Sequence, residues 1–140
     1  MGAHTRVSVR IHYIFSTKDR QSTIPAELEK RLWAYIGGIT RKLDGAALAV
    51  GGVEDHVHIF ILLPPTISVA EMIQKVKANS SRWLREQTGK RFEWQEGYAA
   101  FSVGMSQTEA TIKYIDSQRE HHRRKSVNQE LRAILQKHGL

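Results

Sequence analysis

The 140-residue chain contains no cysteine and only three prolines. The lack of cysteine excludes disulfides, thiolate zinc sites and cysteine nucleophiles. It also removes the need for an oxidising compartment, so we expect a cytoplasmic protein. No repeat, low-complexity tract or linker divides the sequence, and its length is typical of one domain. We therefore expect a single domain over residues 1–140.

Long hydrophobic runs are missing as well. The longest run covers residues 59–63 and ends at Pro64, far short of the roughly 20 apolar residues that cross a bilayer. We therefore expect no membrane partner. Hydrophobic residues still make up 41% of the chain and charged residues 25%, which is typical of a folded globular domain and argues against general disorder.

Negative charge is scarce. There are 21 Lys and Arg residues against 14 Asp and Glu residues, a formal net charge of +7. Such an excess indicates a polyanionic partner, of which nucleic acid is the first candidate. Charge alone does not decide the matter, because many basic proteins bind only counterions.

The hydrophobic periodicity predicts an α+β fold. The apolar residues Val7, Val9 and Ile11 alternate with polar ones, as in a half-buried strand, and Ser68 is placed to cap a helix. The patterns predict a strand at residues 6–15, a helix at 25–43, strands at 46–53 and 56–63, a helix at 69–88, a strand at 98–103, and helices at 106–123 and 127–138.

This β-α-β-β-α-β order is typical of the ferredoxin-like fold. It predicts an antiparallel sheet with helices on one face, followed by C-terminal helices. The other face of the sheet is then available to a second chain, to extra helices or to a polynucleotide.

The strongest local motif is His56-Val57-His58 in the strand predicted at residues 56–63. Residues two apart in a strand point to the same face, so the two imidazoles project together and Val57 projects to the other side. Such a pair can chelate a metal ion. A His-x-His spacing would also arise by chance in roughly one of three such sequences, but two neighbouring histidines inside a core would need costly polar partners. This favours a metal site.

A further candidate pair is Tyr114 and Gln118, four residues apart in the helix predicted at 106–123. This spacing places both side chains on one helical face, where the phenol would serve as a nucleophile and the amide as a third metal ligand. Taken alone, the pair is better explained by a core tyrosine with its hydroxyl at the rim and a solvated surface glutamine.

Basic residues gather in two regions that would contact DNA phosphates, although those after Gln118 also complement a helix dipole. Aromatic residues are interleaved with them and would stack on unpaired bases: Trp83, Phe92 and Trp94. For Trp83 a place in the core is the better explanation, because it lies at helical spacing from Ile73 and Val76. The predicted DNA-binding residues are Lys18, Arg20, Lys75, Lys77, Arg82, Arg85, Arg119, His122, Arg123, Arg124 and Lys125.

Together, these blocks resemble the single-tyrosine HUH transposases of small prokaryotic insertion sequences and their REP-associated relatives, where HUH denotes His-hydrophobe-His. One position departs from the pattern: Ser117 stands where relatives often have Asn, which bears on the local helix. The matching blocks, in family order, are residues 50–58 (VGGVEDHVH), 63–66 (LPPT), 77–83 (KANSSRW), 94–98 (WQEGY), 100–103 (AFSV), 114–118 (YIDSQ) and 120–122 (EHH).

The resemblance implies that Tyr114 is the nucleophile and that His56, His58 and Gln118 hold a divalent metal, Mg²⁺ or Mn²⁺. It implies a homodimer that cuts and rejoins single-stranded DNA beside hairpins through a covalent 5′-phosphotyrosine. Asp55 and His122 are candidates for residues that contact the metal ligands without binding the metal themselves. Asp55 is equally well explained as a turn residue. Two other functions fit the same residues: a non-catalytic regulator that binds hairpin DNA, and a metal phosphohydrolase that uses water instead of Tyr114.

Overall fold

The structure is a computed structural model, and it describes residues 5–121 and 126–140. Its strands are β1 (Val9–Ser16), β2 (Ala46–Val53), β3 (His56–Leu63) and β4 (Ala99–Ser102). Its α-helices are α1 (Glu29–Lys42), α2 (Val69–Thr88), α3 (Thr108–Asp116), α4 (Gln118–His121) and α5 (Val127–Lys137). Short 3₁₀ turns, η1 (Lys18–Arg20), η2 (Ala26–Leu28) and η3 (Met105–Gln107), precede the first and third of these helical segments.

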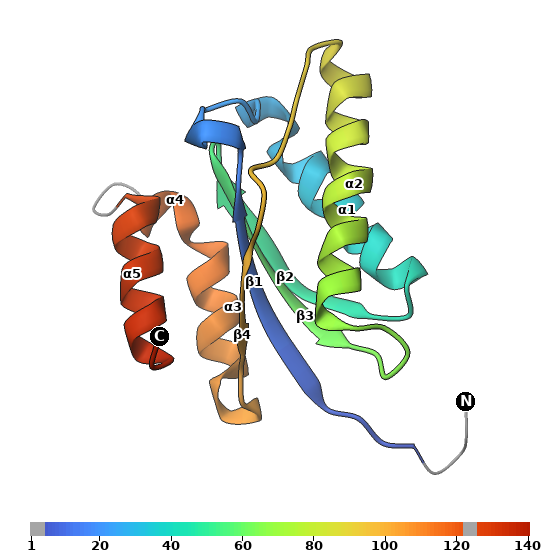
Figure 1. Cartoon of the computed structure of the whole chain (residues 1–140), viewed down its shortest axis with the longest axis vertical. Helices are drawn as coiled ribbons and strands as arrows, with labels where there is room; N and C mark the ends of the chain where they lie inside the picture. The colour runs from blue at the N-terminus through green and yellow to red at the C-terminus, as the bar shows by residue number, and fades with distance from the viewer. Residues whose placement is uncertain (1–4, 122–125) are drawn as a thin grey trace.

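The strands form one sheet in the order β2-β3-β1-β4, and every neighbouring pair is antiparallel (Figure 1). This is the ferredoxin-like arrangement predicted from the sequence. It places β1 and β3, which are distant in the chain, side by side at the centre of the sheet, with Ile14 opposite His58 and Ser16 opposite His56.

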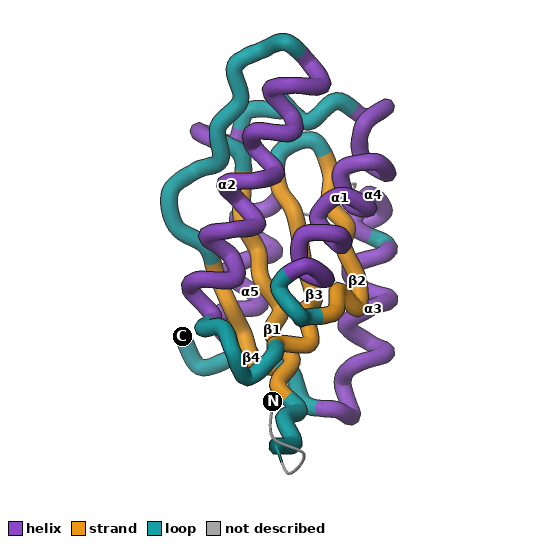
Figure 2. The backbone as a smooth tube through the Cα atoms, turned by 90° about the vertical axis from the view of Figure 1, so that its right-hand side faces the viewer, coloured by secondary structure: helices purple, strands orange, loops and turns teal. Residues whose placement is uncertain are grey.

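Helices α1 and α2 cover one face of the sheet, as Figure 2 shows. The core beneath them takes alternate residues of β3, among them Val57, Ile59 and Ile61, which are fully buried. Helix α2 runs over the predicted residues, because the Ser68 hydroxyl accepts the first-turn amide of Glu71 and Gly89 adopts the left-handed conformation that ends a helix.

The C-terminal helices cover the opposite face, so extra helices, one of the three occupants that the predicted order allowed, fill it. Ile115 of α3 packs there against Ala49 of β2 and Phe60 of β3. The close contact depends on Gly51, because a Cβ atom at this position would lie 2.5 Å from the carbonyl oxygen of Ile115. A residue without a side chain therefore sets how near α3 comes to the sheet.

Several predicted boundaries were wrong. The helix predicted from residue 25 begins as α1 at Glu29, because residues 26–28 form the 3₁₀ turn η2, and the helix predicted from residue 106 begins as α3 at Thr108. Strand β1 begins at Val9 and not at residue 6, because Val9 pairs with Leu63, the last residue of β3, and no partner strand extends further. Strand β4 covers four residues, since it pairs only with Ile11–Ile14 of β1. The helix predicted at 106–123 is interrupted at Ser117, which separates α3 from α4.

Within the described residues, no helix has the length and apolar character needed to cross a membrane.

Candidate metal and nucleophile site

The two histidines of the His-x-His motif lie side by side on the sheet face covered by α3 and α5. Their ring centres are 5.2 Å apart and both side chains are fully buried. Val57 between them enters the opposite core, as strand alternation requires. The folding of β3 therefore delivers two neighbouring imidazoles with fixed backbone positions.

The outer nitrogen of each imidazole is occupied by a second residue. His56 Nδ1 lies 2.8 Å from a carboxylate oxygen of Asp55, and His58 Nδ1 lies 2.8 Å from His12 Nε2 on the neighbouring strand β1. The Nε2 atoms of both rings point inward to a common region. Partners of this kind fix the orientation of metal-binding histidines and determine which nitrogen carries the proton.

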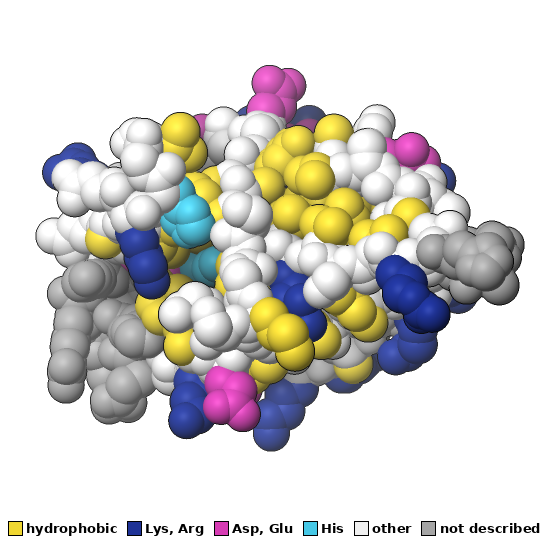
Figure 3. All heavy atoms as spheres, turned by 90° about the horizontal axis from the view of Figure 1, so that it is seen from below, with side chains coloured by type: hydrophobic (Ala, Val, Ile, Leu, Met, Phe, Trp, Pro, Cys, Tyr) yellow, Lys and Arg dark blue, Asp and Glu magenta, His cyan; other side chains and the backbone are white. Residues whose placement is uncertain are grey.

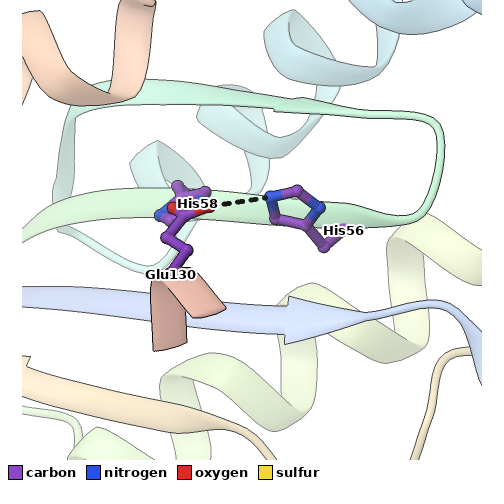
Figure 4. A group of neighbouring side chains, drawn as sticks. All are labelled: His56, His58 and Glu130. Carbon is purple, nitrogen blue, oxygen red and sulfur yellow. Dashed lines mark ion pairs between the residues drawn. The ribbon is translucent and has the colours of Figure 1, made fainter. Parts of the chain in front are cut away.

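A carboxylate from α5, that of Glu130, completes this cluster, although Glu130 was not predicted from the sequence. One of its oxygens lies 2.7 Å from His58 Nε2, and the other lies 3.7 Å from His56 Nε2 (Figure 4). Glu130 is the one buried acid that the structure describes, 4% exposed. Burial alone would raise the pKa of this carboxyl, but hydrogen bonds from His58 and Tyr114 lower it well below its ordinary value, so the group is ionised.

Gln118 reaches the same region from the first residue of α4. Its side-chain oxygen lies 3.2 Å from His56 Nε2, and its side-chain nitrogen donates to the backbone carbonyl of Tyr114 at 3.2 Å. The side chain is buried, 1% exposed. The amide oxygen is therefore turned toward the histidine nitrogens, although Gln118 and Tyr114 belong to two helices separated by Ser117.

Tyr114 stands beside the histidine pair. Its ring centre is 5.7 Å from that of His58, and its hydroxyl donates to the Glu130 carboxylate. Burial, and then this hydrogen bond, raise the pKa of the phenol above its ordinary value. In this arrangement the proton therefore stays on the phenol.

The donor set fits a divalent cation. His56, His58 and Glu130 each offer a ligand atom, and these atoms all lie within 4.8 Å of one another. Two imidazoles with an amide and a carboxylate oxygen suit ions such as Mn²⁺, and the buried surroundings limit competition from water. The group is thus compatible with divalent metal binding.

His12 belongs to this site as well and was not predicted. It is 6% exposed, and burial, followed by the influence of His58, lowers its pKa from 6.5 to about 3. It is therefore neutral, and its Nε2 either donates to or accepts from His58 Nδ1. A cation can bind His58 Nε2 only when the His58 proton sits on Nδ1 and is donated to His12.

The structure separates the predicted DNA-binding residues. Arg119 lies next to Gln118 and pairs with Glu29 at 2.6 Å, whereas the predicted residues of α2 lie on the layer that covers the other face of the sheet. Arg20 is exposed on η1. Lys75 pairs with Glu71, and Arg82 donates to Asn79. His122, Arg123, Arg124 and Lys125 fall outside the described residues.

Three of the predicted residues meet at a hollow of about 470 Å³ beside Trp94, but each is already engaged. Lys18 pairs with Glu93, Lys77 donates to the carbonyls of residues 95 and 97, and Arg85 donates to the carbonyl of residue 92. These contacts hold the segment between α2 and β4.

The proposed role of the aromatic residues in base stacking was wrong for Phe92 and Trp94. Both are buried, at 5% and 9% exposure, because they close the core beneath the segment that precedes β4. Trp83 is half-buried and stacks on Tyr35, with ring centres 5.2 Å apart.

Signals for the two missed residues were present in the sequence. His12 lies two residues before Ile14, so the two side chains point to the same face of β1. Ile14 pairs with His58, and pairing β1 with β3 would therefore have placed His12 on the face that carries His58. Glu130 lies on the same helical stripe as Val127, Leu131 and Ile134. An acidic residue inside an apolar stripe indicates a buried partner.

Comparison with known proteins gives consistent matches. The model of the family described as "Transposase IS200 like" matches residues 5–118. Transposases for insertion sequence element IS200 from Salmonella typhimurium and Salmonella typhi are each 31% identical to this chain over 129 residues, covering 84% of this chain and 82% of theirs.

Two solved structures share the fold. A putative transposase from Deinococcus radiodurans superposes with a TM-score of 0.68 at 21% identity, covering 84% of this chain and 96% of that one. A REP-associated tyrosine transposase bound to a REP hairpin gives a TM-score of 0.63 at 15% identity, covering 87% of this chain and 74% of that one.

Proposed function

The chain belongs to the IS200-like transposase family, and from this premise we propose that it cuts and rejoins single-stranded DNA through a covalent bond to Tyr114. The observation that carries the proposal is the meeting of a phenol with two buried imidazoles whose Nε2 atoms converge. These groups come from β3 and α3, far apart in the sequence, and only the fold unites them.

The proposed step is a transesterification. The Tyr114 oxygen attacks the phosphorus of a phosphodiester, an oxygen–phosphorus bond forms, and the bond from phosphorus to the 3′ oxygen breaks. The phenol loses its proton in this step, and the leaving 3′ oxygen takes up one. The products are a 5′-phosphotyrosine and a free 3′-hydroxyl, so the energy of the phosphodiester is conserved. Attack by another 3′-hydroxyl reverses the step and joins new strands without ATP.

His56, His58 and Gln118 would hold a divalent cation, Mg²⁺ or Mn²⁺, with the Glu130 carboxylate beside them. When bound, the cation supplies polarisation of the scissile phosphate and stabilisation of its developing charge. Asp55 and His12 keep the two rings oriented for that role. Tyr114 holds its proton at the phenolic oxygen, against Glu130, until it attacks.

The proposed substrate is single-stranded DNA that carries hairpins. The net charge of +7 favours a polyanion, and a protein of the same fold has been solved with a REP hairpin. Arg119 is the predicted phosphate-binding residue that lies nearest the site in sequence, next to Gln118. The charges on α2 would then contact DNA at a distance from the reaction.

The test is the formation of an adduct. The protein is incubated with Mn²⁺ and a library of DNA hairpins with randomised single-stranded flanks, and denaturation-resistant complexes are collected and mapped by mass spectrometry. We expect DNA attached to Tyr114, complete loss of the adduct in Tyr114→Phe, and retention in Tyr98→Phe, a change at an exposed tyrosine outside the site.

The other outcomes assign other functions. Cleavage without an adduct that persists in Tyr114→Phe would indicate a phosphohydrolase that uses water. Tight hairpin binding without cleavage in Mg²⁺ or Mn²⁺ would indicate a non-catalytic regulator. Either result would overturn the proposed transferase.

We propose that the protein works as a homodimer in which each subunit processes one DNA end. The described chain places Tyr114 against its own His58, which supports use of the tyrosine within one subunit. Mixing His58→Ala with Tyr114→Phe subunits distinguishes the two arrangements. Use within one subunit predicts no adduct from the mixture, whereas exchange of the tyrosine helix would restore it.

A further inference from the structure

We propose that the cleft between α3 and α5 holds one unpaired nucleotide adjoining the phosphate that Tyr114 attacks. This inference rests on the proposed function and adds a substrate-binding subsite to it. The cleft has a volume of about 550 Å³ and is lined by residues of β1, β4, α3 and α5. Figure 3 shows histidine side chains in a hollow on this side of the molecule, beside a basic side chain.

The inner end of the cleft is the candidate reaction centre. His12, Tyr114 and Glu130 all line it, and hydrogen bonds or ion pairs join His12 and Glu130 to His58, and Tyr114 to Glu130. A nucleotide in the cleft would therefore be adjacent to the nucleophile. Attack at a phosphodiester requires that a neighbouring nucleoside be held close to the phenol.

The size and walls of the cleft suit a nucleobase. Ligand sites commonly have volumes of about 300–1,000 Å³ and are mostly apolar, and here Val103, Ala110, Ala133 and Ile134 form apolar wall. A base in a duplex is stacked and paired, whereas a base in a single strand can enter a pocket at little cost. The cleft therefore favours an unpaired nucleotide.

The distribution of charge supports this orientation. Lys137 and His138 line the cleft at the end of α5, where a cation can contact a phosphate. The carboxylate of Glu130 at the inner end disfavours a second phosphate and admits a neutral base. The His138 ring is stacked on Phe101, with centres 4.6 Å apart and planes 24° apart, so a flat ring is held where a base can stack.

The test measures binding in EDTA, so that it is independent of cleavage. 2-Aminopurine is placed in turn at each position of the single-stranded flanks of a hairpin oligonucleotide. We expect the fluorescence of one position to change on binding. The double variant Ala110→Leu, Ala133→Leu fills the cleft from two exposed positions, and we expect it to abolish that change and weaken binding about tenfold.

Two controls keep the result specific. Ala70→Leu makes the same change at an exposed position of α2 and should bind as the wild type does. An abasic site at the responding position should weaken the wild type about tenfold and leave the double variant unaffected, because the pocket and the base act through one contact.

The charged end of the cleft is tested separately. Lys137→Gln should weaken binding by several-fold and make the slope of log affinity against log salt concentration shallower by about one. Lys30→Gln, at an exposed position on α1, should change neither. If no position responds to binding, or if the filled variant binds and responds like the wild type, the subsite is wrong. A protein that fails to cleave but shows the coupled response keeps the subsite and loses the proposed transferase.

Discussion

The two faces of the sheet are made by the same strands and have opposite chemistry. On the side of α1 and α2, β3 contributes Val57, Ile59 and Ile61 to a continuous apolar core. On the side of α3 and α5, the same strand contributes His56 and His58, which contact ionisable and amide groups. One face uses burial for stability, and the other uses burial to hold polar groups in place.

This division explains how the fold tolerates so polar an interior. Buried polar groups cost stability unless they are paired, and the histidine face pairs them within one network of His12, His56, His58, Gln118 and Glu130. The apolar face supplies the free energy that permits it. Substitutions on the apolar face should therefore change mainly the free energy of unfolding, and substitutions on the histidine face should change mainly the affinity for a metal ion.

The largest effect is expected on the apolar face. Ile59→Ala removes a fully buried side chain and should lower the free energy of unfolding by about 2–5 kcal/mol, measured by urea denaturation. Mn²⁺ affinity of the folded variant should stay within about twofold of the wild type, because the backbone of β3 remains paired. A large loss of metal affinity in the folded variant would show that the faces are not independent.

A smaller effect, confined to the other face, is expected for Glu130→Gln. The change removes the buried negative charge that contacts His58 and should weaken Mn²⁺ binding by about 100-fold, the upper end of what a residue supporting a metal site contributes. Calorimetry gives the affinity, and Glu109→Gln, an exposed acid on α3, is the matched control. Tighter binding in Glu130→Gln would mean that the carboxylate competes with the cation for the Nε2 atoms of the two histidines.

Next in size is the effect of His12, which would act on a bound cation only through His58. His12→Phe removes the partner of His58 Nδ1 and should weaken Mn²⁺ binding about tenfold. His12→Gln keeps a polar group near the same place and should recover most of the affinity. Calorimetry gives both affinities, and an Mn²⁺ affinity in His12→Phe equal to that of the wild type would contradict this role.

The most gradual effect is a pH dependence. The pKa of His12 falls from 6.5 to about 3 in the folded chain, so between these values the unfolded chain binds a proton that the folded chain does not. The free energy of unfolding should decrease as pH falls through this window, by at most about 1.4 kcal/mol per pH unit. Glu130, whose pKa is lowered by its partners, adds to the loss at lower pH.

Denaturation of the metal-free protein at about pH 7 and about pH 5 measures this slope, since the Glu130 carboxyl contributes little above its ordinary pKa of 4.5. The His12→Gln variant should show a shallower slope than the wild type. Equal slopes would place the acid sensitivity in groups other than His12.

Local sequence patterns predicted most of the fold. The bounds of β2, β3 and α2 were correct, because an alternating or helical pattern and a cap or turn residue mark each of them. The ends of β1 and β4 were not, since they depend on where a partner strand ends. The interruption of the helix at Ser117 was not predicted either, because the helical pattern of apolar residues continues through this position.

The candidate site divides in the same way. His56, His58, Tyr114 and Gln118 were found by spacing and resemblance, and the structure brings them together. Glu130 lies 72 positions beyond His58 in the chain, with no local pattern linking the two. Contacts of that kind follow from the packing of α5 on the sheet, which single-residue patterns do not encode.

The pairing of β1 with β3 has a consequence for how the protein acquires activity. Ile14 faces His58 and Ser16 faces His56 across the ladder, so sliding β3 by a single residue would turn the imidazoles into the apolar core and turn Val57 and Ile59 out of it. Misaligned chains would thus be unstable as well as inert. The register between β1 and β3 therefore fixes the apolar core and the candidate site together.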